Sequence, residues 1–169
     1  PDSTLEKLSG SILAHIETNG QLPDSLGMSS TDYFLERTKL NIKLNKITAI
    51  VDSSTSVRNL SGSIRLMPNR TLLVDKVKLD APEYNFKLDN FVFHTKLTGS
   101  LSDLKTIGMK TDTMLVAFGQ NALSGSFTFK NIEKPTYTLN SNVKLNLGEL
   151  KPYIPDSLVE KLGGTITAN

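Results

Sequence analysis

The sequence contains no cysteine and no tryptophan, and only two of its 169 residues are histidine. Without cysteine the chain can form no disulfide, no thiolate zinc site and no cysteine nucleophile. The histidines, His15 and His94, lie far apart and have no ligand spacing such as HExxH, so solvated or structural roles are favoured over metal binding. We therefore expect no metal and no other cofactor.

The chain also has no large excess of positive or negative charge and no long apolar run. The formal net charge is +2, and the lysines lie between alternating apolar residues, which argues against a basic surface for nucleic acid. The longest apolar run, residues 114–118, is far shorter than the ~20 residues of a membrane-spanning helix. We therefore expect any membrane anchor or signal peptide to lie outside this segment.

Catalytic motifs are absent as well. The sequence has no phosphate-binding glycine loop and no GxSxG nucleophile elbow. Asp75, Asp80, Glu83 and Asp89 are close in sequence, but they alternate with lysines, which is typical of an outer strand face with cross-strand ion pairs. We predict that the chain is not an enzyme. A hydrolase that combines His94 with these carboxylates is the catalytic alternative.

Alternation of apolar and polar residues dominates the sequence. The clearest run extends from Tyr137 to Leu147, and such period-two patterns indicate strands with one apolar face. We predict about ten antiparallel strands of roughly five to seven residues, each spanning ~20 Å at ~3.3 Å per residue. An apolar sheet face must be covered by a second sheet, by curling or by a ligand. The predicted fold is therefore mainly β, either a strongly curved sheet, a β-sandwich or an open β-groove.

Helix is scarce. Residues 29–37 predict a short helix with Ser29 and Asp32 at capping-box spacing, and residues 148–153 predict a single turn that Pro155 stops. Residues 101–111 carry the weakest pattern and are predicted to form a loop.

A short phrase of leucine, small residue, glycine, Ser or Thr, and apolar residue occurs five times, with its glycines at Gly10, Gly62, Gly99, Gly125 and Gly164. The outer two copies belong to a longer shared passage, residues 1–14 and 155–168. Each passage predicts a capped helical turn, ended by its leucine and glycine, before a strand. We interpret residues 1–169 as a single β-rich domain that forms one period of a longer protein.

Residues 119–131 (GQNALSGSFTFKN), the alternating run that follows and the turn LNLGEL at 145–150 resemble the carboxy-terminal repeat region of AsmA-like proteins. Residues 155–168 look like the next repeat and residues 1–16 like the preceding one. Residues 20–37 do not match the family pattern and are interpreted as an insertion. The strands, rich in Asn and Lys, resemble a Bacteroidetes version of the family.

The resemblance implies an envelope protein of a Gram-negative bacterium, with a periplasmic body that an amino-terminal helix anchors in the inner membrane. AsmA-like proteins and their TamB-like relatives are implicated in outer-membrane biogenesis and lipid transport. Their relatives form elongated β-grooves whose concave apolar face can carry acyl chains. Phospholipid or another envelope lipid is therefore the expected partner, with other envelope proteins as further candidates.

Two functional hypotheses follow. In the first, the chain is a non-enzymatic lipid-holding or lipid-conducting groove. In the second, it is a structural or interaction β-sandwich module that binds protein or glycan at the cell envelope, through loops such as 20–37 or 101–112. The candidate lipid-binding residues share the apolar face of the predicted strands: Leu40, Ile42, Leu44, Phe86, Leu88, Phe91, Phe93, Phe127, Phe129, Leu139, Val143 and Leu145.

Overall fold

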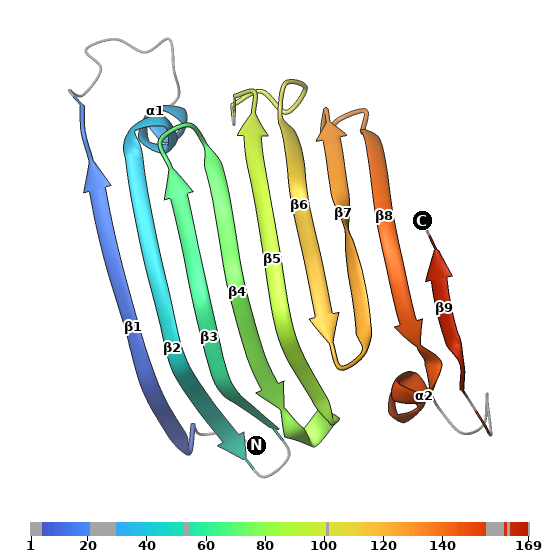
Figure 1. The fold of residues 1–169 in the computed structure, drawn as a ribbon. Helices are drawn as coiled ribbons and strands as arrows, with labels where there is room; N and C mark the ends of the chain where they lie inside the picture. Colours follow the sequence, from blue (N-terminus) through green and yellow to red (C-terminus); the bar gives the residue numbers. More distant parts are fainter. Residues whose placement is uncertain are drawn as a thin grey trace.

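A computed structural model of the chain describes residues 5–20, 30–52, 55–100, 102–154, 161 and 163–168. These residues form one antiparallel sheet of nine strands, in which every strand pairs with its neighbours in sequence (Figure 1). The prediction of a mainly β fold is confirmed, with nine strands in place of about ten. The strands are β1 (Lys7–Thr18), β2 (Thr38–Asp52), β3 (Thr55–Met67), β4 (Thr71–Ala81), β5 (Phe86–Thr98), β6 (Gly108–Phe118), β7 (Asn121–Lys130), β8 (Thr136–Asn146) and β9 (Thr165–Ala168).

Eight of the nine strands are longer than the sequence pattern suggests. β2 has 15 residues and β4 has 11, where five to seven were predicted. Two short alternating runs can belong to one strand: Phe86 with Leu88, and Phe91 with Phe93, all lie in β5 and are separated by a register shift against β4. A bulge inserts an extra residue and interrupts the alternation, so a period-two pattern divides one strand into two.

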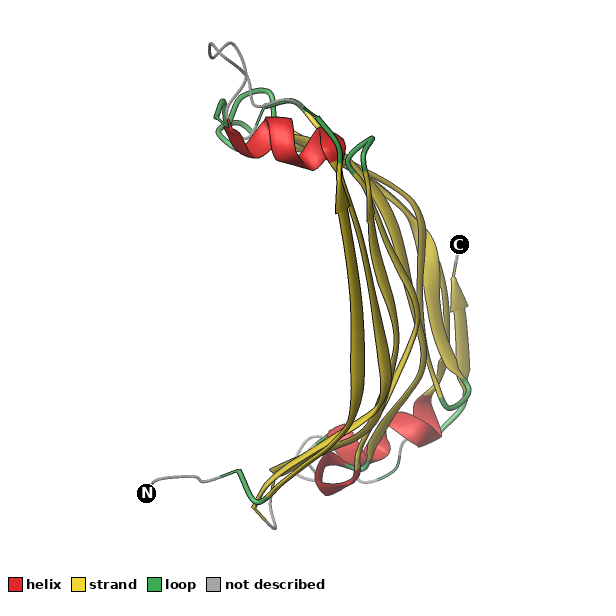
Figure 2. Ribbon diagram, turned by 90° about the vertical axis from the view of Figure 1, so that its left-hand side faces the viewer, coloured by secondary structure: helices red, strands yellow, loops and turns green. Residues whose placement is uncertain are grey.

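Bulges also bend the sheet. Lys46 of β2 and Lys76 of β4 have positive φ angles of 50° and 53°, and both lie where the register with a neighbouring strand shifts. A bulged strand bends and twists more strongly than a regular one. The strands accordingly bow together, and the sheet has one concave and one convex face (Figure 2).

The sheet is a single layer. No second sheet packs against it among the described residues, and the only buried apolar residues there are Tyr33 and Ala81. The described part of the chain is therefore a strongly curved open sheet, and the β-sandwich alternative is wrong for it.

Helix α1 (Ser30–Arg37) lies at one end of the strands, on the concave side (Figure 2). Its Asp32 carboxylate pairs with Arg70 Nη2 at 3.1 Å and accepts a hydrogen bond from Ser100 Oγ at 2.6 Å. Arg70 also pairs with Glu36 at 3.0 Å. These contacts hold α1 against the β3–β4 turn and the segment after β5. The predicted helix is confirmed, while Ser29 lies outside the described residues.

The opposite end carries the helical turn α2 (Leu147–Leu150), followed by the 3₁₀ turn η2 (Lys151–Tyr153). The Asn146 side chain caps α2 by accepting a hydrogen bond from the Gly148 amide at 3.0 Å. Glu149 Oε2 accepts hydrogen bonds from the Gln120 amide at 2.7 Å and from Asn121 Nδ2 at 2.9 Å. The predicted turn over residues 148–153 is confirmed, and it is anchored to the β6–β7 hairpin. A further 3₁₀ turn, η1 (Pro82–Tyr84), joins β4 to β5.

Two local predictions need correction. The predicted loop over residues 101–111 ends early, because β6 begins at Gly108 and pairs with both β5 and β7. The first leucine and glycine, Leu8 and Gly10, do not end a helical turn, because β1 already begins at Lys7. The capping serine of the first predicted turn, Ser3, and residues 155–160 of the second lie outside the described residues.

Candidate functional site: the concave apolar face

All twelve predicted lipid-binding residues lie on one face of the sheet. Residues directly opposite one another in an antiparallel ladder point to the same side, so the register assigns each side chain to a face. Leu40, Phe93 and Leu139 show how far this face extends, since they come from β2, β5 and β8. Three apolar rows cross the strands. They are Ala14–Ile42–Ile64–Val74–Phe93–Met114–Gly125–Ser141, Ile16–Leu40–Leu66–Leu72–Thr95–Thr111–Phe127–Leu139, and Val77–Phe91–Val116–Leu123–Val143–Ala168.

The structure adds residues that the sequence prediction did not include. β3, β4 and β6 contribute fully to the same face, and so does the edge strand β1. The signal was present, because these strands alternate with the same period. The added apolar residues include Ile12, Ile16, Ile64, Leu66, Leu72, Val74, Val77, Leu79, Met114 and Val116, together with Leu123 of β7.

Aromatic rings enrich the middle of this face. The rings of Phe91 and Phe93 are stacked, with centroids 6.3 Å apart and planes 7° from parallel. The Phe86 ring lies 5.9 Å from that of Phe118, at a tilt of 49°. Such pairs add to the stability of the apolar surface without needing a second layer.

None of the twelve residues is buried. Leu139 is 53% exposed, and the other eleven are partly exposed. Apolar residues in the core of a two-layer sheet protein are mostly shielded almost completely. The face is therefore a solvent-accessible apolar surface of the described structure.

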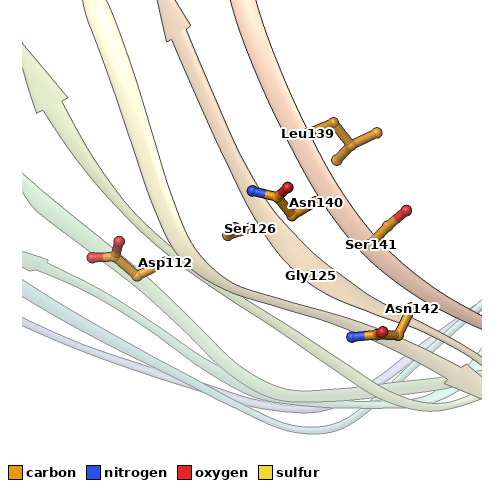
Figure 3. A pocket seen from close by; sticks show the side chains of 7 residues that line it. All are labelled: Asp112, Gly125, Ser126, Leu139, Asn140, Ser141 and Asn142. Carbon is orange, nitrogen blue, oxygen red and sulfur yellow. The ribbon is translucent and has the colours of Figure 1, made fainter. Parts of the chain in front are cut away.

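This face is the concave one. Leu139 lies on the inner side of the bend of β8, whereas Asn140 points to the outer side (Figure 3). The apolar rows thus line the inside of the curved sheet.

Two polar residues interrupt the apolar rows near the centre. Thr95 and Thr111 lie opposite each other and are 3% and 1% exposed. Thr111 Oγ1 donates to Thr95 Oγ1 at 3.0 Å, and Thr95 Oγ1 donates to the Lys110 carbonyl at 3.3 Å. Since both hydroxyls are hydrogen-bonded, they present little unsatisfied polarity to an apolar ligand.

Charged contacts join neighbouring strands on the convex face, where apolar residues such as Leu73 and Leu115 also lie. Asp75 pairs with Arg65 Nη2 at 2.7 Å and with His94 Nε2 at 2.6 Å, so three neighbouring strands are joined. Burial raises the pKa of Asp75, but the hydrogen bonds from Arg65 and His94 outweigh this, and the net pKa lies below the usual carboxylate value. The predicted cross-strand ion pairing is confirmed for Asp75, with arginine as the partner where lysine was expected.

The residues of the hydrolase alternative are only partly brought together. Asp75 contacts His94, whereas Asp80 accepts from Asn59 Nδ2 at 2.7 Å and Glu83 pairs with Arg58 at 3.8 Å. Among the described residues, no group of three or more His, Asp or Glu side chains is arranged to hold a metal ion. This arrangement offers an ion-paired strand face and gives no positive support for a catalytic site.

A shallow hollow of about 620 Å³ lies over β6, β7 and β8 (Figure 3). Its polar lining includes Asp112, Ser126, Asn140 and Asn142. Ser126 and Asn140 lie opposite each other on the convex side of the sheet. This hollow offers amide and hydroxyl groups, whereas the concave face offers an extended apolar surface.

Comparison with protein-family models, with curated proteins and with solved structures found no match. None of the helices in the described part of the chain combines the length and the hydrophobicity that a membrane crossing requires.

Proposed function

We propose that this chain is a periplasmic segment of an AsmA-like protein that holds or conducts phospholipid acyl chains on its concave apolar face. The observation that carries the proposal is the apolar face of the sheet, which no second layer covers among the described residues. An exposed apolar surface larger than a few hundred Å² usually marks a place where a protein, membrane or ligand binds. A lipid would cover what a second sheet covers in a sandwich.

The dimensions of the face suit acyl chains. β6 has 11 residues, which correspond to about 36 Å at ~3.3 Å per residue. One leaflet contributes about half of the ~30 Å hydrocarbon core of a bilayer, so an extended acyl chain fits along a strand with room to spare. Each buried methylene contributes about 0.8 kcal/mol, and the headgroup can stay in water at the end of the strands.

The rows also suit movement across the sheet. The row from Ala14 to Ser141 places one small or apolar side chain at the same level of eight successive strands. Burial of apolar surface is non-directional, so a lipid that shifts from one strand to the next meets a similar environment. Successive strands therefore provide equivalent positions along which a lipid can be conducted.

The first test compares two double variants that add the same charge on opposite faces. Phe127 and Leu139 are direct partners on the concave face, and Ser126 and Asn140 are direct partners on the convex face. We expect F127D/L139D to retain at least about tenfold less phospholipid than the wild type, because buried carboxylates oppose acyl-chain binding. S126D/N140D should retain phospholipid normally.

Lipid is measured by native mass spectrometry and by extraction from protein purified from bacterial membranes, with circular dichroism as the folding control. Wild-type protein without co-purifying lipid, or an equal loss in both double variants, would contradict the proposal. Alanine substitution of His94 tests the hydrolase alternative, because unchanged function in cells argues against it.

The proposed location is the periplasm, with the full-length protein anchored in the inner membrane by a helix outside this segment. The full-length protein should fractionate with inner membranes, and a protease added to spheroplasts should cleave this segment. Protection of the segment in spheroplasts would contradict that location.

The second candidate is an interaction module that binds protein or glycan at the cell envelope. The hollow with Asn140 and Asn142 favours it, because amide groups are suited to hydrogen bonds with sugar hydroxyls. N140A/N142A should abolish glycan binding on an array while phospholipid retention stays unchanged. The two measurements thus separate the two functions.

A further inference from the structure

Another hollow lies at the end of the strands where α2 and the β6–β7 turn are found (Figure 1). β5 begins at Phe86, whereas its pairing with β6 begins at Asn90. The first residues of β5 therefore extend past the β6–β7 turn and form one wall of the hollow, and α2 with η2 forms the other. The hollow has a volume of about 270 Å³ and is lined by Asn85, Lys87, Phe118, Gly119, Glu149 and Pro152.

Phe118 joins this hollow to the concave apolar face. It lies two residues after Val116 in β6, so both side chains are on the same face of the sheet. The Phe118 ring lies 5.9 Å from the ring of Phe86, which belongs to the candidate lipid-binding residues. A lipid whose acyl chains cover the concave face therefore has this hollow at one end of its chains.

Glu149 brings a negative charge to the hollow, and no described lysine, arginine or histidine forms an ion pair with it. Its Oε2 atom accepts hydrogen bonds from the Gln120 amide at 2.7 Å and from Asn121 Nδ2 at 2.9 Å. At the other end of the strands, by contrast, Asp32 and Glu36 both pair with Arg70. Glu149 is partly buried, and charges attract one another more strongly there than in bulk water. The hollow is therefore suited to a ligand that carries a positive charge.

The other groups of the lining indicate which cation fits. A primary ammonium donates charge-assisted hydrogen bonds to a carboxylate, and an aromatic ring such as that of Phe118 attracts it as well. Lys87 lies on the opposite wall, and its side chain is 69% exposed. Its pair with Asp89, at 3.4 Å, is an exposed ion pair of the kind that contributes little, so the lysine is free to turn to an anion. A negative and a positive group thus face one hollow.

We propose that this hollow binds the headgroup of a phospholipid that carries a primary ammonium, with the ammonium at Glu149 and the phosphate at Lys87. The inference rests on the proposed function, to which it adds the class of headgroup and the orientation of the lipid. The acyl chains extend along the concave face from the α2 end of the strands toward the α1 end. Phospholipids without an ammonium leave Glu149 unpaired and are retained less well.

The first experiment measures which headgroup the protein retains. The protein is incubated with vesicles that contain equal amounts of phosphatidylethanolamine and phosphatidylglycerol with identical acyl chains. The vesicles are then removed, and the bound lipids are quantified by native mass spectrometry. Both lipids have the phosphate, but only phosphatidylethanolamine has the ammonium. We expect about tenfold more bound phosphatidylethanolamine than phosphatidylglycerol.

Glu149→Gln tests the position of the ammonium. Glutamine removes the charge but keeps an oxygen that accepts the hydrogen bonds from Gln120 and Asn121, so α2 stays anchored. Bound phosphatidylethanolamine should fall to the level of phosphatidylglycerol, which brings the ratio of the two lipids to about one. The matched control is Glu133→Gln, which removes an exposed carboxylate between β7 and β8, at the other end of the strands. It should keep the wild-type ratio.

Lys87→Gln tests the position of the phosphate. Since both lipids carry the phosphate, we expect the bound amounts of both to fall alike, by about twofold to fivefold. Lys130→Gln removes an exposed lysine at the end of β7, on the other side of the sheet's length, and should leave both amounts unchanged. Circular dichroism checks the folding of all four variants.

The outcomes separate this inference from the proposed function. A wild-type protein that retains neither lipid would contradict both. Equal retention of the two lipids, or a wild-type ratio in E149Q, would overturn the headgroup site and leave the acyl-chain face in place. Glycerophosphoethanolamine, which has the headgroup without acyl chains, should displace little bound lipid when added in excess. Complete displacement would show that the hollow binds a soluble compound, and it would overturn the assignment to a lipid.

Discussion

The concave and convex faces of this sheet are built by alternate residues of the same strands, yet they differ in the side chains that they expose to solvent. On the concave side, Phe91, Phe93 and Leu139 form an apolar surface that nothing covers among the described residues. On the convex side, Arg65, Asp75 and His94 join neighbouring strands through charged contacts. The convex face therefore contributes side-chain contacts that stabilise the sheet, while the concave face stays available to a ligand.

The comparison shows how a single layer keeps its shape. Backbone pairing runs through all nine strands, and contacts at the strand ends, such as Asp32 with Arg70 and Glu149 with Asn121, hold the short helices in place. Stability in this arrangement depends more on ladders and polar contacts than on a buried apolar core. Substitutions on the two faces should accordingly change the free energy of unfolding by different amounts and through different interactions.

The largest expected effect comes from Gly125→Val on the concave side of β7. A Cβ at Gly125 would overlap the Asn140 carbonyl oxygen and lie 3.0 Å from Ser141 Cα, so the two strands must separate. We expect a loss of about 3 kcal/mol or more in the free energy of unfolding, measured by urea denaturation. The control is Ser124→Val, one residue away on the convex face. It should change the free energy of unfolding by less than about 0.5 kcal/mol.

Phe93→Ala tests whether the concave face is open. A buried phenylalanine loses about 3–5 kcal/mol on truncation, but the partly exposed Phe93 ring should lose only about 1–2 kcal/mol in lipid-free protein. Bound phospholipid should increase that loss, because the ring would then be covered. A loss at the level of a core residue without lipid would show that another part of the protein covers this face.

Asp75→Asn tests the convex network. We expect a loss of about 1 kcal/mol near neutral pH, because the hydrogen bonds to Arg65 and His94 lose their charged acceptor. The folded-state pKa of Asp75 lies below its usual 3.8, so its contribution is complete above that value and disappears as the pH falls through the lowered pKa. Urea denaturation of both proteins over an acid series should therefore show their difference shrinking only at strongly acid pH. A difference that persists there would contradict this account.

The smallest effect is expected for Asn142→Ala on the convex face. Asn142 is exposed and lies opposite Ser124. Its truncation should change the free energy of unfolding by less than about 0.5 kcal/mol, which calorimetry would record as a small shift in Tm. A large shift would mean that the hollow around Asn142 has a structural role.

The common face of the twelve candidate residues was predictable because alternation along a strand is a local property. The joining of Phe86 and Leu88 to Phe91 and Phe93 in one strand was not, because a bulge interrupts the period without ending the strand. The contact of Asp32 with Arg70 was not predictable either. It depends on where the β3–β4 turn lies relative to α1, and the sequence separation of the two residues carries no signal for it.

Alternation in the sequence is enough to predict strands with two different faces, since successive side chains of an extended backbone point to opposite sides. The three-dimensional fold was needed to show that the apolar side forms one concave surface without a second layer among the described residues. A sandwich and an open groove require the same alternation. They differ only in whether distant strands pair edge to edge or pack face to face, and bulges and strand register decide that outcome.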